Sequence, residues 1–119
     1  VRIAPAGKHL LVDGGGALRL DHYSAPVGGH RPAVDLLFRS LSGQPPMRVA
    51  AVLLSGMGTD GAEAMAALRN ANVLTVAQDK ASCAVFGMPK AAISNRAAAF
   101  ALAPRQIGRL LARAGGAKL

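Results

Sequence analysis

The stretch LLSGMGTDGAEAM, residues 53–65, joins two leucines to a glycine-rich turn and then to an alanine-rich segment. The residues VAAVLL at 49–54 are apolar at every position, as expected of a parallel strand covered on both faces. We therefore predict a strand at 49–54, a tight turn at 56–61 and a helix at 60–70. The apolar side chains that this helix turns inward are Ala62, Met65, Ala66 and Leu68.

Two further patterns precede this stretch. The runs 9–12 and 17–20 flank DGGG at 13–16, which predicts a β-hairpin because glycine permits the positive φ that such turns need. A helix is expected to open at Pro32 and to end before Gly43. Its inward side chains, at helical spacing, are Val34, Leu37, Phe38 and Leu41.

The alternation continues to the end of the chain. We expect a strand at 73–77, a short helix after Pro89, a weak strand at 99–102 and a last helix opened by Pro104. Alternation of strands and helices predicts an α/β fold with a mostly parallel sheet flanked by helices, doubly wound and Rossmann-like. The hairpin is expected to form an antiparallel edge of that sheet.

Composition limits the organisation of the chain. A chain of 119 residues with 51% hydrophobic residues and few aromatic ones forms at most one domain, residues 1–119, with an aliphatic core. No apolar run is long enough to span a membrane, and residues 1–20 lack a signal-peptide pattern. The single cysteine, Cys83, suits a reducing cytoplasm, and we expect it in the core or at a strand end.

The net charge of +8 raises the question of a nucleic-acid ligand. The basic residues are spaced singly, and the one concentration is Arg105, Arg109, Arg113 and Lys118, with the arginines on one helix face. Such a stripe is usually a solvated face, and only one tyrosine is available to stack on a base. We therefore expect no nucleic-acid binding, and an acidic protein partner fits the charge equally well.

The turn at 56–61 matches the dinucleotide-binding pattern G-x-G-x-x-G. Asp79 follows it by roughly 20 residues, where a ribose-binding acid is expected. Asp60, however, places a carboxylate where the pyrophosphate would approach. Two unit charges about 4 Å apart repel by about 4 kcal/mol at an effective dielectric near 20. The pattern matches a dinucleotide site, but the charge opposes one.

Two other interpretations of Asp60 are open. Asp60 can cap its own helix, with Glu63 at the spacing of a capping box, which stabilises a helix by about 1 kcal/mol. Alternatively, an acid held by backbone donors at a helix start stays ionised and can orient the histidine of a nucleophilic triad. Spacing alone favours the cap.

From Val1 to about Leu111 the sequence resembles the C-terminal half of the catalytic domain of bacterial chemoreceptor protein-glutamate methylesterases, the chemotaxis response-regulator methylesterase family. The matching stretches are IAPAGKHLLV (3–12), HRPAVDLLF (30–38), VLLSGMGTDGAEAM (52–65) and AQDKASCAVFGMPKAAI (77–93). The resemblance implies a cytoplasmic carboxylic ester hydrolase that needs no cofactor or metal. Such an enzyme removes γ-methyl esters from glutamates on chemoreceptor helices, and often deamidates glutamine there, by a Ser-His-Asp mechanism.

The resemblance also assigns residues. It implies that Asp60 is the triad aspartate and that the backbone N–H of Met57 is an oxyanion-hole donor, which would explain the glycines around it. The family's serine lies in a G-x-S-x-G-G turn and its histidine in a Gln-His-Met stretch, and this chain has neither. We expect a structural role for His30 and no catalytic role for His9 or His22.

The missing serine and histidine leave two hypotheses of different class. The first is a portion of a methylesterase catalytic domain, inactive alone, which in the family follows a receiver domain and acts on methylated chemoreceptor helices. The second is a non-catalytic interaction module of the same fold. A dinucleotide-binding half-domain is a weaker third.

Overall fold

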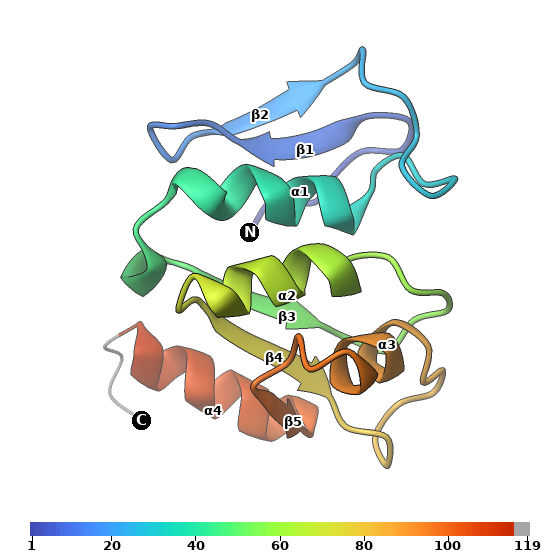
Figure 1. Ribbon diagram of the computed structural model, residues 1–119, viewed down its shortest axis with the longest axis vertical. Coiled ribbons are helices and arrows are strands. Elements are labelled where there is room, and N and C mark those ends of the chain that lie inside the picture. The colour runs from blue at the N-terminus through green and yellow to red at the C-terminus, as the bar shows by residue number, and fades with distance from the viewer. Residues whose placement is uncertain (116–119) are drawn as a thin grey trace.

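Three parallel strands form the sheet that carries the predicted loop, and they lie in the order β3-β4-β5 (Figure 1). The computed structural model describes residues 1–115, so Lys118 lies outside the described residues. The strands are β3 (Ala50–Leu53), β4 (Leu74–Gln78) and β5 (Phe100–Leu102). Val76 of β4 pairs in register with Val52 of β3 and Phe100 of β5. The parallel sheet predicted from the alternation is confirmed.

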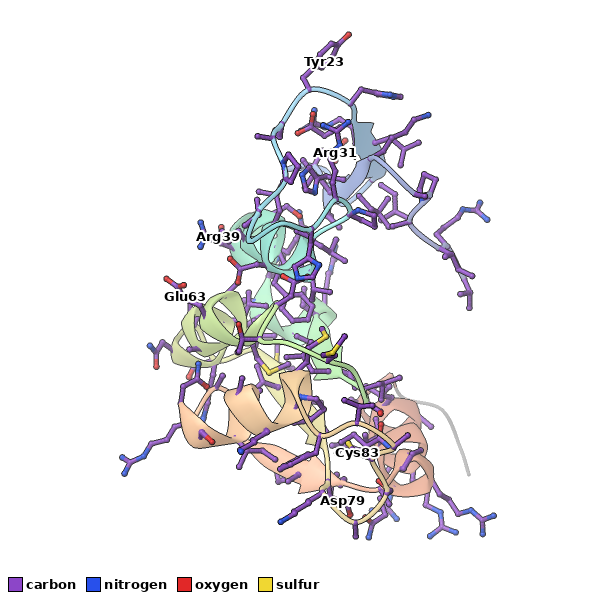
Figure 2. All side chains as sticks on the ribbon, turned by 90° about the vertical axis from the view of Figure 1, so that its right-hand side faces the viewer. Tyr23, Arg31, Arg39, Glu63, Asp79 and Cys83 are labelled. Atoms are coloured by element: carbon purple, nitrogen blue, oxygen red, sulfur yellow. The ribbon has the colours of Figure 1, made fainter. Side chains whose placement is uncertain are left out.

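Helices cover both faces of this sheet. The helices α2 (Ala62–Asn70) and α3 (Met88–Ser94) lie on one face and α4 (Pro104–Ala114) on the other, as Figures 1 and 2 together show. Residues 75–78 of β4 are buried in succession, as expected of a central strand covered on both sides. The arginines of α4 predicted to share a face, at 105, 109 and 113, are all exposed, while Ile107 is buried.

The hairpin of β1 (His9–Val12) and β2 (Leu18–Asp21) is a separate two-stranded sheet, so the expected antiparallel edge of the parallel sheet is wrong. The helix α1 (Val34–Ser40) lies between the hairpin and α2 (Figure 1). The buried side chains of β1 pack on α1, and the Val12 N–H donates to Ser40 Oγ at 2.9 Å. The hairpin therefore buries its inner face against a helix instead of extending a sheet.

The core is aliphatic, as the composition predicts. It is built mainly from small and unbranched side chains, and Met65 at its centre is 0% exposed. Phe38 of α1 is the one aromatic residue in the cluster. Within residues 1–115, none of the helices combines the length and the apolar character that crossing a bilayer requires.

Both helix starts differ from the prediction by two residues. The helix α1 begins at Val34 and not at Pro32, because Ala33 is extended (φ −110°, ψ 130°) and serves as the N-cap. The helix α2 begins at Ala62 and not at position 60, because its N-cap is Gly61 in the left-handed region (φ 88°). After α1, the short 3₁₀ turns η1 (Leu41–Gly43) and η2 (Pro46–Arg48) lead into β3, which confirms the predicted helix end.

Gly61 is the point at which the two helix starts touch. A Cβ atom on Gly61 would lie 2.7 Å from Val34 Cγ1 and 3.2 Å from Leu53 Cδ2, both closer than ordinary van der Waals contact. The positive φ also disfavours any residue with a side chain. Glycine at this position therefore lets α1 approach the start of α2.

We expect Gly61→Ala to lower the free energy of unfolding by about 2 kcal/mol or more, because strain at positive φ adds to the clash with Val34. The matched control is Gly108→Ala on α4, where a Cβ meets nothing within 4 Å. That change is expected to stabilise the chain by about 0.5–1 kcal/mol. Urea denaturation followed by circular dichroism measures both, and a Gly61→Ala chain as stable as wild type would contradict the close approach.

Candidate active site

The glycine loop, residues 56–61, lies beyond the carboxyl end of β3, where open parallel sheets form their ligand crevices. Its start is tied to the segments that follow β4. The Ser55 N–H donates to Gln78 Oε1 at 2.7 Å, and the Gly56 N–H donates to the Val85 carbonyl at 3.0 Å. The Met88 N–H in turn donates to the Gly56 carbonyl at 2.9 Å. The loop is therefore fixed to the segment that leads into α3.

Asp60, the predicted acid of this loop, caps a helix other than its own. Its Oδ2 accepts the Val34 N–H at 2.8 Å and its Oδ1 accepts the Asp35 N–H at 2.9 Å. These N–H groups belong to the first two residues of α1 and have no partner within that helix. The predicted cap on α2 is wrong, and Glu63, the predicted capping-box partner, is exposed.

The capping of α1 leaves Asp60 able to do more. The N-terminus of a helix attracts negative charge, which suits a carboxylate at this place. A carboxylate has about four lone-pair positions, and the two N–H groups of α1 use two of them. The half-buried carboxylate therefore retains acceptor capacity for a further donor.

Asp35 is a second acid of this region, and the sequence analysis missed it. It is 7% exposed, its Oδ1 accepts the Ala64 N–H at 3.0 Å, and its Oδ2 pairs with Arg39 Nη2 at 2.8 Å. Ala64 is the third residue of α2, so an acid of α1 caps α2. Acids are common in first helical turns, which was an available signal, but no spacing rule names the helix that they contact.

Met57, the predicted oxyanion-hole donor, lies in the exposed part of the glycine loop, and its side chain is 83% exposed. Within residues 1–115 its backbone N–H donates to no other group, so it remains free for a ligand. The loop passes very close to Gly87: a Cβ there would lie 2.6 Å from the Gly56 carbonyl oxygen and 2.9 Å from the Gly58 nitrogen. The absence of a side chain at position 87 therefore holds this backbone in place.

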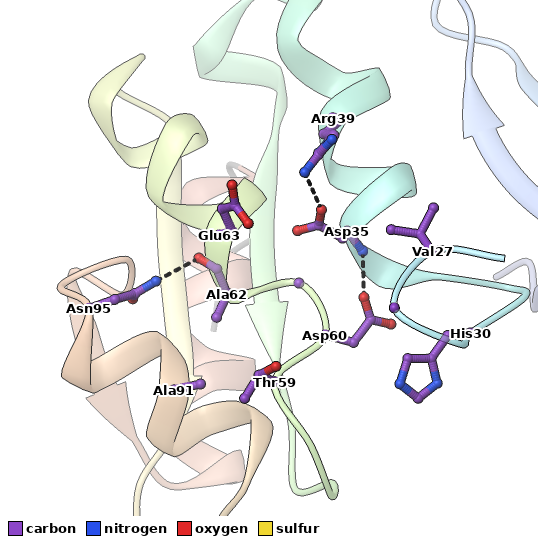
Figure 3. Close-up of a pocket in the computed structure, with 12 residues that line it drawn as sticks. Val27, His30, Asp35, Arg39, Thr59, Asp60, Ala62, Glu63, Ala91 and Asn95 are labelled. Atoms are coloured by element: carbon purple, nitrogen blue, oxygen red, sulfur yellow. Dashed lines mark hydrogen bonds and ion pairs between the residues drawn. The ribbon is translucent and has the colours of Figure 1, made fainter. Parts of the chain in front are cut away.

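A cleft of about 460 Å³ opens beside Asp60 (Figure 3). Asp35 and Arg39 line it from α1, Glu63 from α2, and Asn95 from the end of α3. The Asn95 side chain donates to the Ala62 carbonyl at 3.1 Å and so ties α3 to the start of α2. The other lining residues are Val27, Gly28, His30, Thr59, Asp60, Gly61, Ala62 and Ala91. The cleft thus brings the predicted acid together with side chains from three helices.

The histidines occupy three different settings. The ring of His30 lines the cleft (Figure 3), and its backbone N–H and carbonyl bond with Val27. The structural role expected of its side chain stays a prediction. His9 is fully buried: its Nδ1 accepts the Ala33 N–H at 3.2 Å, and its Nε2 donates to the Ala25 carbonyl at 2.9 Å. His9 therefore holds the N-cap residue of α1.

His22 is exposed on the turn that follows β2, away from the residues that line the cleft. Asp21 organises this turn. The Ser24 hydroxyl and the N–H groups of Tyr23 and Ser24 donate to its carboxylate, and they lower its pKa to about 2. Neither residue takes part in the cleft.

Cys83 and Asp79 also lie outside the cleft. Partial burial, and after it the nearby Asp79 carboxylate, raise the pKa of the Cys83 thiol, which favours the unreactive protonated form. The thiol lies 3.8 Å from the Gln78 carbonyl oxygen, but Cys83 is a half-buried residue of the loop that follows β4. The expected place in the core or at a strand end is therefore wrong. The Asp79 carboxylate accepts the Ser82 N–H at 3.0 Å and so caps a turn instead of facing a ligand.

Comparison with known sequences identifies relatives. Residues 1–111 match the family model described as CheB methylesterase. The chain is 43% identical over 116 residues to a protein-glutamate methylesterase/protein-glutamine glutaminase of Symbiobacterium thermophilum, covering 98% of this chain and 32% of the relative. It is 45% identical over 114 residues to the protein of the same description in Paraburkholderia xenovorans, covering 93% and 32%. The chain thus spans about a third of the length of the curated relatives it matches.

The fold matches as well. The crystal structure of the Thermotoga maritima CheB methylesterase catalytic domain superposes with a TM-score of 0.84 at 32% sequence identity, covering 93% of this chain and 60% of that domain. Residues 1–111, which the family model matches, include the hairpin, the glycine loop and the parallel sheet. The chain therefore belongs to the CheB methylesterase family.

Proposed function

We propose that this chain is one portion, residues 1–119, of a catalytic domain that hydrolyses γ-methyl esters of glutamate side chains in proteins and can deamidate glutamine side chains. The relatives' names carry both activities. The observation that carries the proposal is the Asp60 carboxylate, which α1 holds at the cleft by two N–H donors and which retains acceptor capacity.

In the proposed mechanism Asp60 accepts the Nδ1–H of a histidine. This contact fixes the imidazole tautomer and stabilises the imidazolium that forms when the histidine takes the proton of a serine. The serine oxygen then attacks the side-chain carbonyl carbon, and the free N–H of Met57 donates to the developing oxyanion. Methanol leaves from an ester and ammonia from an amide, so one site serves both reactions, and water hydrolyses the acyl-enzyme.

The serine and the histidine have to come from another segment of a complete catalytic domain. This chain has neither the serine turn nor the histidine stretch of the family. The chain covers only 60% of the Thermotoga maritima catalytic domain, which leaves room in the fold for such a segment. The glycine loop then contributes the acid and the oxyanion donor.

The proposed substrates are methylated glutamates on the cytoplasmic helices of chemoreceptors, reached in the bacterial cytoplasm. A receiver domain that gates the site is the proposed regulatory partner. Family membership supports both proposals. A non-catalytic interaction module remains the alternative of another class, and the missing nucleophile is the feature that favours it.

The dinucleotide-binding alternative is weakened by the capping contacts. A pyrophosphate at the start of α2 would compete with Asp35, whose carboxylate already accepts the Ala64 N–H. It would also approach the Asp60 carboxylate on the same loop. Two negative groups thus lie where the fingerprint needs free N–H donors.

The first functional test uses a hybrid domain in which this chain replaces the matching segment of the Symbiobacterium thermophilum relative. We expect Asp60→Asn to lower kcat for release of methanol from methylated receptor by about 10⁴, because the tautomer of the histidine is no longer fixed. The matched control is Asp13→Asn. Asp13 also accepts two backbone N–H groups, those of Gly15 and Ala17, but in the hairpin turn.

Asp13→Asn is expected to leave kcat within about twofold, since a turn remote from the cleft does not touch the reacting groups. Near-normal turnover with Asp60→Asn would reduce Asp60 to a helix cap. A hybrid domain that folds and shows no activity with its wild-type residues would also count against the proposal.

The second test asks whether this chain acts alone. We expect the 119-residue chain to release no methanol from a glutamyl methyl ester above the rate in buffer, since it lacks the family's serine and histidine. The active hybrid domain is the positive control. Turnover by the chain alone would mean that one of its own serines is the nucleophile, and the assignment of the missing triad members to another segment would be wrong.

A further inference from the structure

The starts of α1 and α2 are capped reciprocally, each by an acid that belongs to the other helix or to the loop before it. Asp60, on the loop before α2, accepts the first two N–H groups of α1, and Asp35, on α1, accepts the N–H of Ala64 in α2. Neither helix has a side-chain cap from its own N-cap residue, which is Ala33 for α1 and Gly61 for α2. Each helix start therefore depends on the acid that the other helix, or its preceding loop, supplies.

This reciprocal capping couples the positions of the two helices. Moving α1 away from α2 would break three hydrogen bonds together and leave helix-start N–H groups without partners. Because these N–H groups would lose their acceptors, each bond that is kept opposes the loss of the other two. The Asp35 side chain, being 10% exposed, has little water to replace its lost partner.

The two acids differ in what they leave free. Asp35 uses Oδ1 for Ala64 and Oδ2 for Arg39, so both of its oxygens are engaged within the protein. Asp60 bonds only to backbone N–H groups, and it lies beside the cleft without a cationic partner among the described residues (Figure 3). This arrangement leaves the negative charge of Asp60, and not that of Asp35, available to a ligand or a histidine.

We propose that Asp35 is a positioning residue for Asp60: its bond to Ala64 anchors the start of α2, and with it the loop that holds the Asp60 carboxylate against α1 and toward the cleft. The structural part of this inference stands on the contacts alone. Its consequence for catalysis rests on the proposed function.

Amide hydrogen exchange in the 119-residue chain tests the structural part. We expect Asp35→Ala to speed exchange of the Val34 amide by at least about tenfold, although its own acceptor, Asp60, is unchanged. Asp35→Asn keeps an oxygen for the Ala64 N–H and is expected to restore most of the protection at Val34. Asp13→Ala is the matched control and should affect only the hairpin turn.

Faster exchange at Ala64 with unchanged exchange at Val34 would overturn the inference, because Asp35 would then cap α2 without holding Asp60. If Asp35→Ala does not fold, the reverse variant decides. Asp60→Asn, which leaves the acceptor of Ala64 in place, should speed exchange at Ala64 if the two caps are coupled. Unchanged exchange at Ala64 in that variant would also overturn the inference.

The catalytic part is tested in the hybrid domain. We expect Asp35→Ala to lower kcat by about 10–100-fold with KM within about twofold, because a displaced Asp60 misorients the histidine without touching the substrate. In the Asp60→Asn background the same change should lower kcat no further. If the kcat losses of the two changes multiply fully in the double variant, the inference is overturned. An Asp60→Asn variant with normal kcat would instead overturn the proposed function, and amide hydrogen exchange would then decide whether the two caps are coupled.

Discussion

The start of α1 imposes the constraint on which the rest of the site depends. The first N–H groups of a helix have no partner within it, and at α1 the N-cap residue supplies no side-chain acceptor for them. Asp60 satisfies two of them from the glycine loop. The position of that loop therefore depends on a helix that is distant in sequence. The positions of Met57 and of the cleft depend in turn on the loop.

Close backbone approach explains the glycines better than a phosphate does. Gly61 allows contact with Val34, and Gly87 lets the loop before α3 pass against residues 56–58. A pattern that resembles a dinucleotide fingerprint thus arises from packing of one loop between α1 and α3. The same packing leaves the Met57 N–H without a partner in the described part of the chain, residues 1–115, and a free N–H is the property that an oxyanion donor needs.

The features that could be predicted from the sequence are those that depend on neighbouring residues. Hydrophobic periodicity predicted β3, α2 and β4 with small shifts at their ends, and the loop at the strand end directed attention to Asp60. Contacts between residues far apart in the sequence could not be predicted in this way. Spacing assigned Asp60 to its own helix, overlooked Asp35, and added the hairpin to the parallel sheet. In each case α1 is one of the two elements in contact, and no local pattern encodes which elements α1 separates or joins.

The cap and the triad acid, treated as alternatives in the sequence, are compatible in the structure. A carboxylate that served only as the cap of α2 would use one oxygen to accept a backbone N–H. A carboxylate that served only to orient a histidine would need no contact with a helix start. Asp60 gives one oxygen to each of two N–H groups of α1 and keeps further acceptor positions at the cleft. The helix start that needs the acid also stabilises its negative charge, which is the form a triad requires. The stability of the fold and the proposed chemistry therefore depend on the same carboxylate. A residue that holds Asp60 in place serves both.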